Sequence, residues 1–393
     1  MATYEEIYGK RVEVLDADPT LNSSYEGQVW YNSATGTLKT VVSFSAWSSG
    51  SSVITARYGT SGAGTQTAGL MIAGNSSSTS DTYITNTEEY NGSGWGTGGA
   101  LPTGTRSGAG FGTQTAALYA GGYDGSNTAE AYTYNGTAWT GIPALNTARR
   151  SLDNMGAGTT TAAIVAGGYI EPPYTAISEE FNGSSWSEGD NLNTDRANAA
   201  AAGIQTAAFM AGGNTPPETG ATENYDGTSW TNSGSLNTAR RLLGGGGSQT
   251  DGIVFGGYAP PGNQNLVENY DGTAWTANPA TLATARHGGA SGSQPGAASS
   301  TFYASGYSPS SPEPLTGVTE EFTKSVNTVT AAAWAAGGNL GTARAYVTGA
   351  GLQTAAIVVA GYNGAVKSNV EEYNGASWSE ENNLGTSRYN VAT

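Results

Sequence analysis

The chain has 393 residues, of which 59 are Gly and only 12% are charged, and its formal net charge is −16. The acidic balance makes nucleic acid and anionic membranes unfavourable partners, and the lack of Cys excludes disulfides and thiolate metal sites. Low charge with 10% aromatic residues is typical of a folded chain rather than a disordered one. No apolar run approaches the roughly 18 residues of a membrane span, and no basic, apolar leader follows Met1, so we expect neither membrane insertion nor a signal peptide.

Residues 1–46 are expected to form a small β module of their own. The run "GQVWYNSATGTLKTVV" predicts two β-rich segments around a Ser-Ala-Thr-Gly turn. A segment of this length is marginal for an independent hydrophobic core. We therefore interpret this module as an anchor that attaches the chain to something else.

From residue 47 onward the chain is dominated by a repeat of roughly 45 residues. An Arg closes a "TAR"-like segment eight times and so delimits seven units, at approximately 57–106, 106–149, 149–196, 196–240, 240–286, 286–344 and 344–388. These arginines are Arg57, Arg106, Arg149, Arg196, Arg240, Arg286, Arg344 and Arg388. Such internal periodicity indicates a repeat architecture.

Each unit predicts four short strands. The Gly/Ala-rich segment after the Arg suits a crowded inner strand, and an apolar run such as "IVAGG" suits a buried second strand. The alternation in "TEEY" or "TENY" suits a third strand, and Asn-Gly or Asp-Gly then predicts a tight hairpin into a fourth strand that opens with Trp. The repeated tryptophans are Trp95, Trp139, Trp186, Trp230, Trp275, Trp334 and Trp378. Seven such units predict an all-β, seven-bladed β-propeller over residues 47–393.

Trp47 leaves the closure of this ring open. It precedes Arg57 as the repeated Trp precedes the other arginines, so the chain has one more Trp-to-Arg half than Gly-Gly half. Either the Trp47 strand is an extra strand at the junction, or it replaces the last strand in closing the ring. We expect seven blades, with the Trp47 half beside the terminal blade.

The segments between the second and third strands vary from unit to unit, as in "YIEPPYTAIS" and "NTPPETGAT". In an up-and-down blade they share one face with the Trp-to-Arg connections, while the Asn-Gly hairpins occupy the other. Pro stiffens several of these loops, and Tyr offers rigid contact area near them. The candidate binding residues are Tyr123, Tyr169, Tyr174, Tyr258, Tyr307 and Tyr362. The competing interpretation is that the loops are insertions tolerated at the solvent surface.

The order Arg, strand, Gly-Gly, Glu/aromatic and Trp resembles the kelch repeat over residues 57–388, as in "RSGAGFGTQTAALYAGGY…YTYNGTAW" of unit two. The resemblance implies a propeller with the Trp packed between blades, and it says almost nothing about function. Units one, six and seven depart from it, with Ala73, Ser305 and Ala360 in place of the first Gly of the pair. That position therefore needs a small residue rather than Gly.

The run "YEGQVWYNSATGTLKTVV" followed by these units also resembles structural proteins of tailed phages, especially marine ones, in which a short β module precedes kelch-like repeats. This implies a virion protein of the capsid surface or tail, assembled in the host cytoplasm and present as a homo-oligomer or in many copies. Residues 1–46 would then bind other virion proteins, and the propeller would recognise a host-surface glycan or protein. The alternative is a capsid or tail decoration protein that binds no receptor.

We expect no catalytic residue, metal site or cofactor. The repeated Arg, and the Glu two residues before the aromatic of most units, are interpreted as scaffold in which Arg pairs with Glu or with backbone carbonyls, because catalysis does not need seven copies of one group. Oxidases of the galactose oxidase type need a Cys-linked Tyr and His ligands for copper, whereas this chain has no Cys and one His, His287. The sequence therefore predicts a non-enzymatic protein.

Overall fold

The computed structural model describes residues 13–18, 29–171, 174–292, 298–308, 314–329, 338–352 and 355–389. All regular secondary structure in these ranges is β-strand. The chain divides into two compact units, one of residues 42–327 and one of residues 1–41 together with 328–393.

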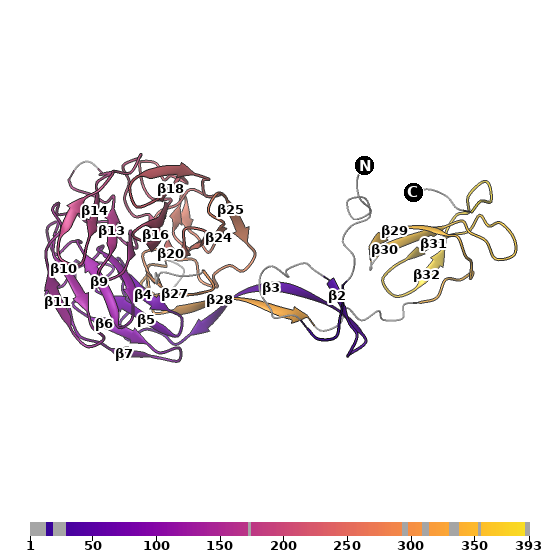
Figure 1. Ribbon diagram of the computed structural model, residues 1–393, viewed down its shortest axis with the longest axis horizontal. Coiled ribbons are helices and arrows are strands. Elements are labelled where there is room, and N and C mark those ends of the chain that lie inside the picture. Colours follow the sequence, from indigo (N-terminus) through magenta and orange to yellow (C-terminus); the bar gives the residue numbers. More distant parts are fainter. Residues whose placement is uncertain are drawn as a thin grey trace. The chain divides into compact units, whose positions relative to one another are not determined.

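The unit of residues 42–327 contains six antiparallel sheets with four strands each in this unit (Figure 1). The first strands are β4 (Ser61–Thr65), β8 (Ala109–Thr113), β12 (Gly156–Gly158), β16 (Ala200–Ile204), β20 (Gly244–Ser248) and β26 (Ala290–Ser291). The second strands are β5 (Ala68–Ile72), β9 (Ala116–Ala120), β13 (Ala163–Ala166), β17 (Ala207–Ala211), β21 (Asp251–Phe255) and β27 (Ser300–Ala304). The third strands are β6 (Thr87–Tyr90), β10 (Ala131–Tyr134), β14 (Ser178–Phe181), β18 (Thr222–Tyr225), β24 (Val267–Tyr270) and β28 (Thr319–Val329). The fourth strands are β7 (Trp95–Thr97), β11 (Trp139–Ile142), β15 (Trp186–Glu188), β19 (Trp230–Ser233), β25 (Trp275–Asn278) and β3 (Thr37–Gly50), the last from Val42 onward.

The first strands follow one another in a circle. Contacts run in the order β4, β8, β12, β16, β20, β26 and back to β4. A circle of backbone hydrogen bonds of 2.7 to 3.0 Å accompanies them. Its N–H···O bonds run from Gly59 to Gly288, Ser107 to Gly59, Leu152 to Ser107, Asn198 to Ser151, Leu242 to Asn198 and Gly288 to Leu242. The arrangement is propeller-like, and its circle contains six sheets.

The small residues of the first strands are required by this crowding. A Cβ on Gly156 would come within 2.3 Å of the Phe111 ring of the preceding sheet, and one on Gly246 within 2.7 Å of the Gly292 carbonyl oxygen of the next. The second strands, by contrast, carry large apolar side chains such as Phe209 and Ile253, which are fully buried between sheets. Small inner residues thus allow the strands to converge, and larger ones fill the widening space outside them.

The Asn-Gly and Asp-Gly hairpins differ from the expected two-residue turn. The loop from Asn135 to Ala138 has four residues, and only Gly136 of the pair has a positive φ, at 90°. The Asn135 side-chain oxygen instead accepts hydrogen bonds from the Thr137 and Ala138 backbone N–H groups, at 3.0 and 2.9 Å. The side chain of Asn, rather than a left-handed Asn backbone, organises the turn.

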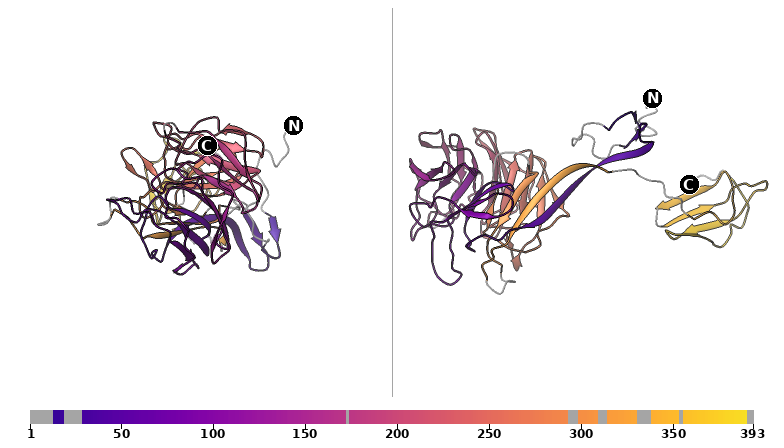
Figure 2. Two further views of the ribbon diagram at one scale, coloured as in Figure 1. Left: turned by 90° about the vertical axis from the view of Figure 1, so that its left-hand side faces the viewer. Right: turned by 90° about the horizontal axis from the view of Figure 1, so that it is seen from below.

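Trp47 decides how the circle is completed. Strand β3 is the neighbour of β28 in the sixth sheet, and Figures 1 and 2 show the two strands side by side. Trp47 packs against Phe322 of its own sheet at 5.2 Å and against Phe255 of the preceding sheet at 4.9 Å, ring centre to ring centre. The Trp47 strand therefore takes the fourth place in unit six. Trp334, expected there, lies outside the described residues.

The other unit contains strands from both ends of the chain. Strand β1 (Glu13–Leu15) pairs in parallel with β2 (Val29–Asn32), and β2 pairs antiparallel with the start of β3, which matches the expected hairpin. Repeat seven forms its own four-stranded sheet of β29 (Thr348–Leu352), β30 (Ala355–Val359), β31 (Val370–Tyr373) and β32 (Trp378–Glu380). The expectation of seven blades in one ring is not confirmed: the circle of contacts contains six sheets, and this sheet belongs to a different compact unit.

Candidate functional site

The repeated Arg and Glu form buried ion pairs inside single sheets. Arg196 Nη2 lies 2.5 Å from Glu223 Oε1, and neither side chain has measurable exposure. The same Glu accepts the backbone N–H of Asn193, which lies in the connection from the preceding sheet. The equivalent pairs are Arg57–Glu88, Arg149–Glu179, Arg240–Glu268, Arg286–Glu320 and Arg344–Glu371. Each pair thus holds the chain where it passes from one sheet to the next.

Unit two is the exception. Arg106, expected to be its repeated Arg, does not occupy the buried position. Arg106 pairs across an isolated bridge with Tyr123, as Arg150, one residue after the buried Arg149, pairs with Tyr169. The place of the buried Arg is taken by Thr105, and that of its Glu by Tyr132. Both charges of the pair are therefore missing together, so no unpaired charge is buried.

Within the circle, the described side chains of the repeated Trp pack between sheets. Each stacks on the aromatic residue opposite it in the third strand, for example Tyr134 on Trp139 at 4.9 Å. Trp139 also donates its Nε1 hydrogen to Thr87 of the preceding sheet, at 2.9 Å. Equivalent bonds run from Trp95 to Thr319, Trp230 to Ser178 and Trp275 to Thr222. These residues are scaffold, which leaves the loop face as the place for a site.

On that face, the residue after each buried Arg, or after Thr105 in unit two, pairs with the first residue of the variable loop. The pairs are Tyr58–Asn75, Arg106–Tyr123, Arg150–Tyr169, Ala197–Asn214, Arg241–Tyr258 and His287–Tyr307. Because one such pair stands at the inner end of every loop, aromatic and cationic side chains gather around the centre of the circle. We call the following set the collar: Tyr58, Tyr83, Arg106, Tyr123, Arg150, Tyr169, Tyr174, Arg241, Tyr258, His287 and Tyr307.

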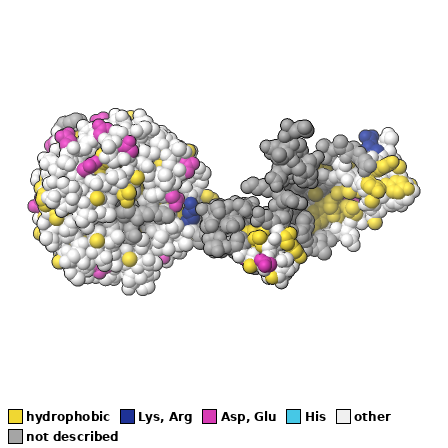
Figure 3. Space-filling model, in the orientation of Figure 1, with side chains coloured by type: hydrophobic (Ala, Val, Ile, Leu, Met, Phe, Trp, Pro, Cys, Tyr) yellow, Lys and Arg dark blue, Asp and Glu magenta, His cyan; other side chains and the backbone are white. Residues whose placement is uncertain are grey.

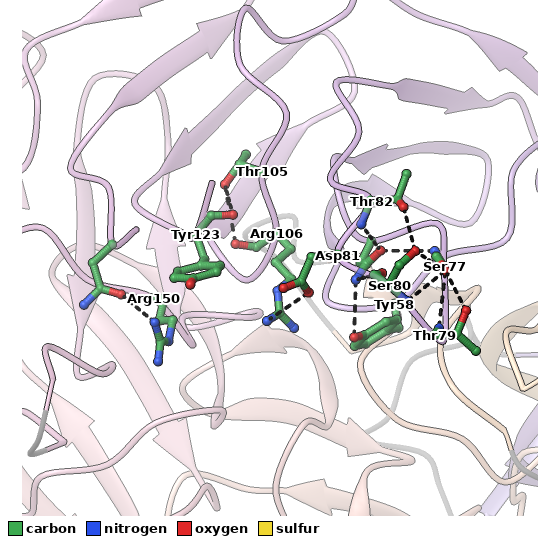
Figure 4. A network of polar contacts seen from close by, with 12 residues as sticks. Tyr58, Ser77, Thr79, Ser80, Asp81, Thr82, Thr105, Arg106, Tyr123 and Arg150 are labelled. Carbon is green, nitrogen blue, oxygen red and sulfur yellow. Dashed lines mark hydrogen bonds and ion pairs between the residues drawn. The ribbon is translucent and has the colours of Figure 1, made fainter. Parts of the chain in front are cut away.

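Guanidinium groups and aromatic rings alternate along one arc of the collar. The guanidinium carbon of Arg106 lies 5.5 Å from the ring centre of Tyr83 and 5.4 Å from that of Tyr123. Arg150 lies 4.6 Å from Tyr123 and 4.8 Å from Tyr169. Figure 4 shows the side chains of Tyr123, Arg106 and Arg150 on this arc. These separations are those of cation–π contacts.

The opposite arc has the same composition. Arg241 lies 5.1 Å from the ring centre of Tyr258, and the His287 ring lies 5.9 Å from Tyr258 and 5.3 Å from Tyr307. Tyr307 is in turn 6.3 Å from Tyr58, which belongs to the first arc. The two arcs therefore meet where the last sheet of the circle adjoins the first.

Polar contacts join the arcs at their other ends. The Tyr174 ring lies 5.5 Å from that of Tyr169, and its hydroxyl accepts a 2.6 Å hydrogen bond from Asn214. Asn214 pairs with Glu218, whose carboxylate lies 3.4 Å from Arg241. The chain of contacts consequently passes through all six sheets.

The collar concentrates the available positive charge of the circle. Five of the eight arginines in residues 42–327 are the fully buried, paired ones. The other three, Arg106, Arg150 and Arg241, have side-chain exposures of 26%, 25% and 33%. Their nearest carboxylates, on Asp81, Glu171 and Glu218, stand 3.9, 3.6 and 3.4 Å away. Such distances leave guanidinium donors able to bind an incoming anion.

His287 is neutral under ordinary conditions. Burial, together with the charge of Arg241, lowers its pKa to about 4. Its Nδ1 lies 2.7 Å from the Asn263 side-chain oxygen, which holds the ring in place. His287 therefore contributes an aromatic ring and a hydrogen-bonding group to the collar, and no positive charge.

The centre of the circle is filled by an insertion in unit three. Fourteen residue steps separate Arg149 from Ala163, in place of the twelve that separate Arg196 from Ala208. The insertion includes Asn154, whose amide donates to the carbonyls of Leu243 and Gly289 in the fifth and sixth sheets. Its neighbour Asp153 is fully buried, and burial raises the pKa of its carboxyl to about 6. The insertion thus closes the centre beneath the collar.

Five of the six predicted binding tyrosines lie in the collar, namely Tyr123, Tyr169, Tyr174, Tyr258 and Tyr307. Tyr362 belongs to the sheet of repeat seven and contacts Tyr389. The sequence pattern did not single out Tyr58, Tyr83, Arg150 or Arg241, and it assigned Arg106 to the scaffold. The doublets Arg149-Arg150 and Arg240-Arg241 carried a signal, since a second Arg after a buried one has no scaffold role.

A scan of protein-family models and a search of curated proteins find no match to this chain. Within the described residues there is no group of three or more His, Cys, Asp or Glu side chains placed to hold a metal ion. The same residues include no helix of the length and hydropathy needed to cross a membrane. The collar is therefore the candidate site among the described residues.

Proposed function

We propose that the chain is a non-enzymatic recognition protein whose collar binds an acidic glycan. The observation that carries the proposal is the alternation of tyrosines with the three partly exposed arginines of the circle. Tyr rings offer flat apolar faces on which sugar rings stack, and a guanidinium fork binds a carboxylate in two parallel hydrogen bonds. The collar is held by contacts through six sheets, which lowers the entropy lost when a ligand is bound.

We further propose that the six-sheet circle is a kelch-like six-bladed propeller carried by a tailed-phage virion. The supports are the repeat order of Arg, Gly-Gly, Glu/aromatic and Trp, and the N-terminal run "YEGQVWYNSATGTLKTVV". In this proposal residues 1–36 attach the chain to other virion proteins, and the collar faces the host. Strand β3 marks the boundary of the anchor, since its residues from Val42 onward complete the sixth sheet.

The test of recognition is titration of the intact protein with host surface polysaccharides, both acidic and neutral, by calorimetry. Replacing Arg106 and Arg150 by Gln is expected to weaken binding of an acidic polysaccharide about 100- to 10,000-fold, because two charged hydrogen-bonding groups contribute about 1.5–3 kcal/mol each. Added salt should weaken binding in the same way. Lys324→Gln is the matched control, since Lys324 is similarly exposed but lies at the opposite hairpin face, 3.4 Å from Asp251.

Three results would count against recognition at the collar. They are no saturable binding to any host polysaccharide, equal loss in the Lys324 control, or unchanged affinity in the double variant. The first of these would favour the alternative of a decoration protein without receptor binding. The virion proposal is tested separately, by asking whether a chain without residues 1–36 keeps its thermal unfolding transition and no longer joins particles.

A further inference from the structure

Repeat seven is built as a complete sheet of the same kind as those in the circle. Arg344 pairs with Glu371, as Arg196 pairs with Glu223. Tyr373 packs on Trp378 at 5.0 Å and 36°, the same values as for the Phe181–Trp186 pair of the third sheet. We call this sheet, β29–β32, the C-terminal sheet.

Both faces of the C-terminal sheet are more exposed than those of the circle. Four of the five residues of β5, β9, β17, β21 and β27 are buried, whereas none of the five residues of β30 is. The exposed large apolar residues of repeat seven are Tyr346 at 63%, Val347 at 39%, Tyr362 at 40%, Val366 at 39% and Tyr389 at 51%. Figure 3 shows hydrophobic side chains gathered on the surface of this sheet.

The circle shows how one such sheet packs against another. The third-strand Tyr of a sheet donates its hydroxyl hydrogen to the side chain just before the third-strand aromatic of the preceding sheet. These bonds run from Tyr90 to Glu321, Tyr134 to Glu89, Tyr225 to Glu180 and Tyr270 to Asn224. Two sheets have Phe in place of this Tyr and so lack the hydroxyl donor. The preceding sheets then have no Glu at the acceptor position: Thr133 precedes the sheet of Phe181, and Asn269 precedes the sheet of Phe322. Within the circle, Glu occupies the acceptor position only where the next sheet offers a Tyr donor.

The C-terminal sheet carries both halves of this contact. Glu372 occupies the acceptor position and is exposed, and Tyr373 occupies the donor position and is half-buried. Adjacent residues of a strand point to opposite faces of a sheet, so the acceptor serves one face and the donor the other. One C-terminal sheet can thus bind a second on either side.

Tyr346 provides an independent indication. It has a φ of 54°, in the left-handed region that a bulky residue rarely adopts. The corresponding residues of the circle, among them Leu242 at 54° and Asn198 at 55°, use this conformation to make the hydrogen bonds between sheets. Among the described residues no such backbone bond is found for Tyr346. Its backbone therefore has the conformation for a contact with a further sheet.

We propose that the C-terminal sheet is an interface between copies of this chain, in which the Tyr373 face of one copy packs against the Glu372 face of the next. A second copy is the fitting partner because its C-terminal sheet offers the complementary face, while the sheets of the circle already pack on both sides. The contact is head-to-tail, so it builds a ring or a filament and not a symmetric pair. In the circle, six sheets complete one turn of contacts. If neighbouring copies are related by the same rotation as neighbouring sheets of the circle, six copies complete a ring of identical sheets.

The test uses the full chain and two variants with one face disabled in each. The molecular mass in solution is measured by light scattering after gel filtration. The intact protein is expected to show a multiple of 39.8 kDa, up to sixfold. Glu372→Lys and Tyr373→Lys are each expected to abolish assembly, whereas Ala376→Lys, in the exposed hairpin at the end of the sheet, is expected to leave it unchanged.

Mixing the two disabled variants distinguishes this interface from simple misfolding. Each retains one intact face of opposite kind, so the mixture should form a one-to-one dimer that grows no further. A monomeric intact protein, or assembly unaffected by both substitutions, would overturn the proposal. Two monomeric variants that fail to combine when mixed would overturn it as well, since folded head-to-tail faces must complement one another.

Discussion

Removing the cation from one buried ion pair tests whether the repeated Arg is scaffold. Arg240 is fully buried, its Nη1 lies 2.5 Å from Glu268 Oε1, and burial lowers the pKa of Arg240. Glu268 also accepts hydrogen bonds from the backbone and side-chain N–H groups of Asn237, both at 2.7 Å. In Arg240→Met these bonds remain, but the carboxylate is left buried without a counter-charge. Breaking a buried pair in this way costs about 3–5 kcal/mol.

The expected loss corresponds to a decrease in melting temperature of about 10 °C, taking about 2–4 °C for each kcal/mol in a domain of this size. The double variant Arg240→Met/Glu268→Gln removes the orphan charge and should recover about 1–3 kcal/mol relative to the sum of the single variants. Unit two supports this, since its sheet forms with Thr105 and Tyr132 in these two places.

The assay is thermal unfolding followed by Trp fluorescence, with both single variants, the double variant and Lys324→Met as an exposed control. The control should change the free energy of unfolding by less than about 0.5 kcal/mol. A neutral Arg240→Met, or a double variant whose loss equals the sum of the two single ones, would refute the argument that the pair stabilises the connection between sheets.

Three further predictions concern single buried groups. Trp47 Nε1 has no hydrogen-bond partner within the described residues, and Val267 occupies the position at which four other sheets offer Thr87, Ser178, Thr222 or Thr319 to a Trp. Val267→Thr should therefore raise the free energy of unfolding by about 0.5–1.5 kcal/mol in urea titrations. Burial raises the pKa of Asp153 to about 6, so the folded state favours the protonated carboxyl and the free energy of unfolding falls as pH rises through 6. Asp153→Asn should therefore raise the melting temperature at pH 7.5 and leave it nearly unchanged at pH 4. Burial and the charge of Arg241 lower the pKa of His287 to about 4, so the free energy of unfolding falls as pH falls from 6.5 towards 4. In His287→Gln the melting temperature should no longer fall over this pH range for this reason. A decrease as steep as in the intact protein would contradict the prediction.

The strands were predictable because their signals are local. An apolar run bounded by Gly-Gly, or an Asn-Gly loop between Tyr134 and Trp139, specifies its strand or turn within a few residues. The loop face was predictable for a related reason, since an up-and-down order of strands brings the variable loops to one end. Five of the six Tyr candidates lie in the collar as a result.

The alignment of unit two was not predictable in this way. A single Arg after Thr105 matched the repeat pattern, and only the backbone pairing of Arg106 with Tyr123 places it in the collar. Its guanidinium group contacts rings from three different loops or connections, at Tyr58, Tyr83 and Tyr123. Contacts of this range depend on the packing of whole sheets.

The sequence by itself determined the repeat, the four strands of every unit except the sixth and most of the residues that pack between sheets, because hydrophobic period, turn chemistry and paired charges act over short distances. Only the tertiary structure decided the number of sheets in the circle, because closure depends on the angle between packed sheets and on which strand reaches the sixth one. That strand is β3, and Trp47 on it occupies the gap between Phe255 and Phe322. The sheet of repeat seven forms in a compact unit different from that of the circle, and its faces carry the proposed contact between copies.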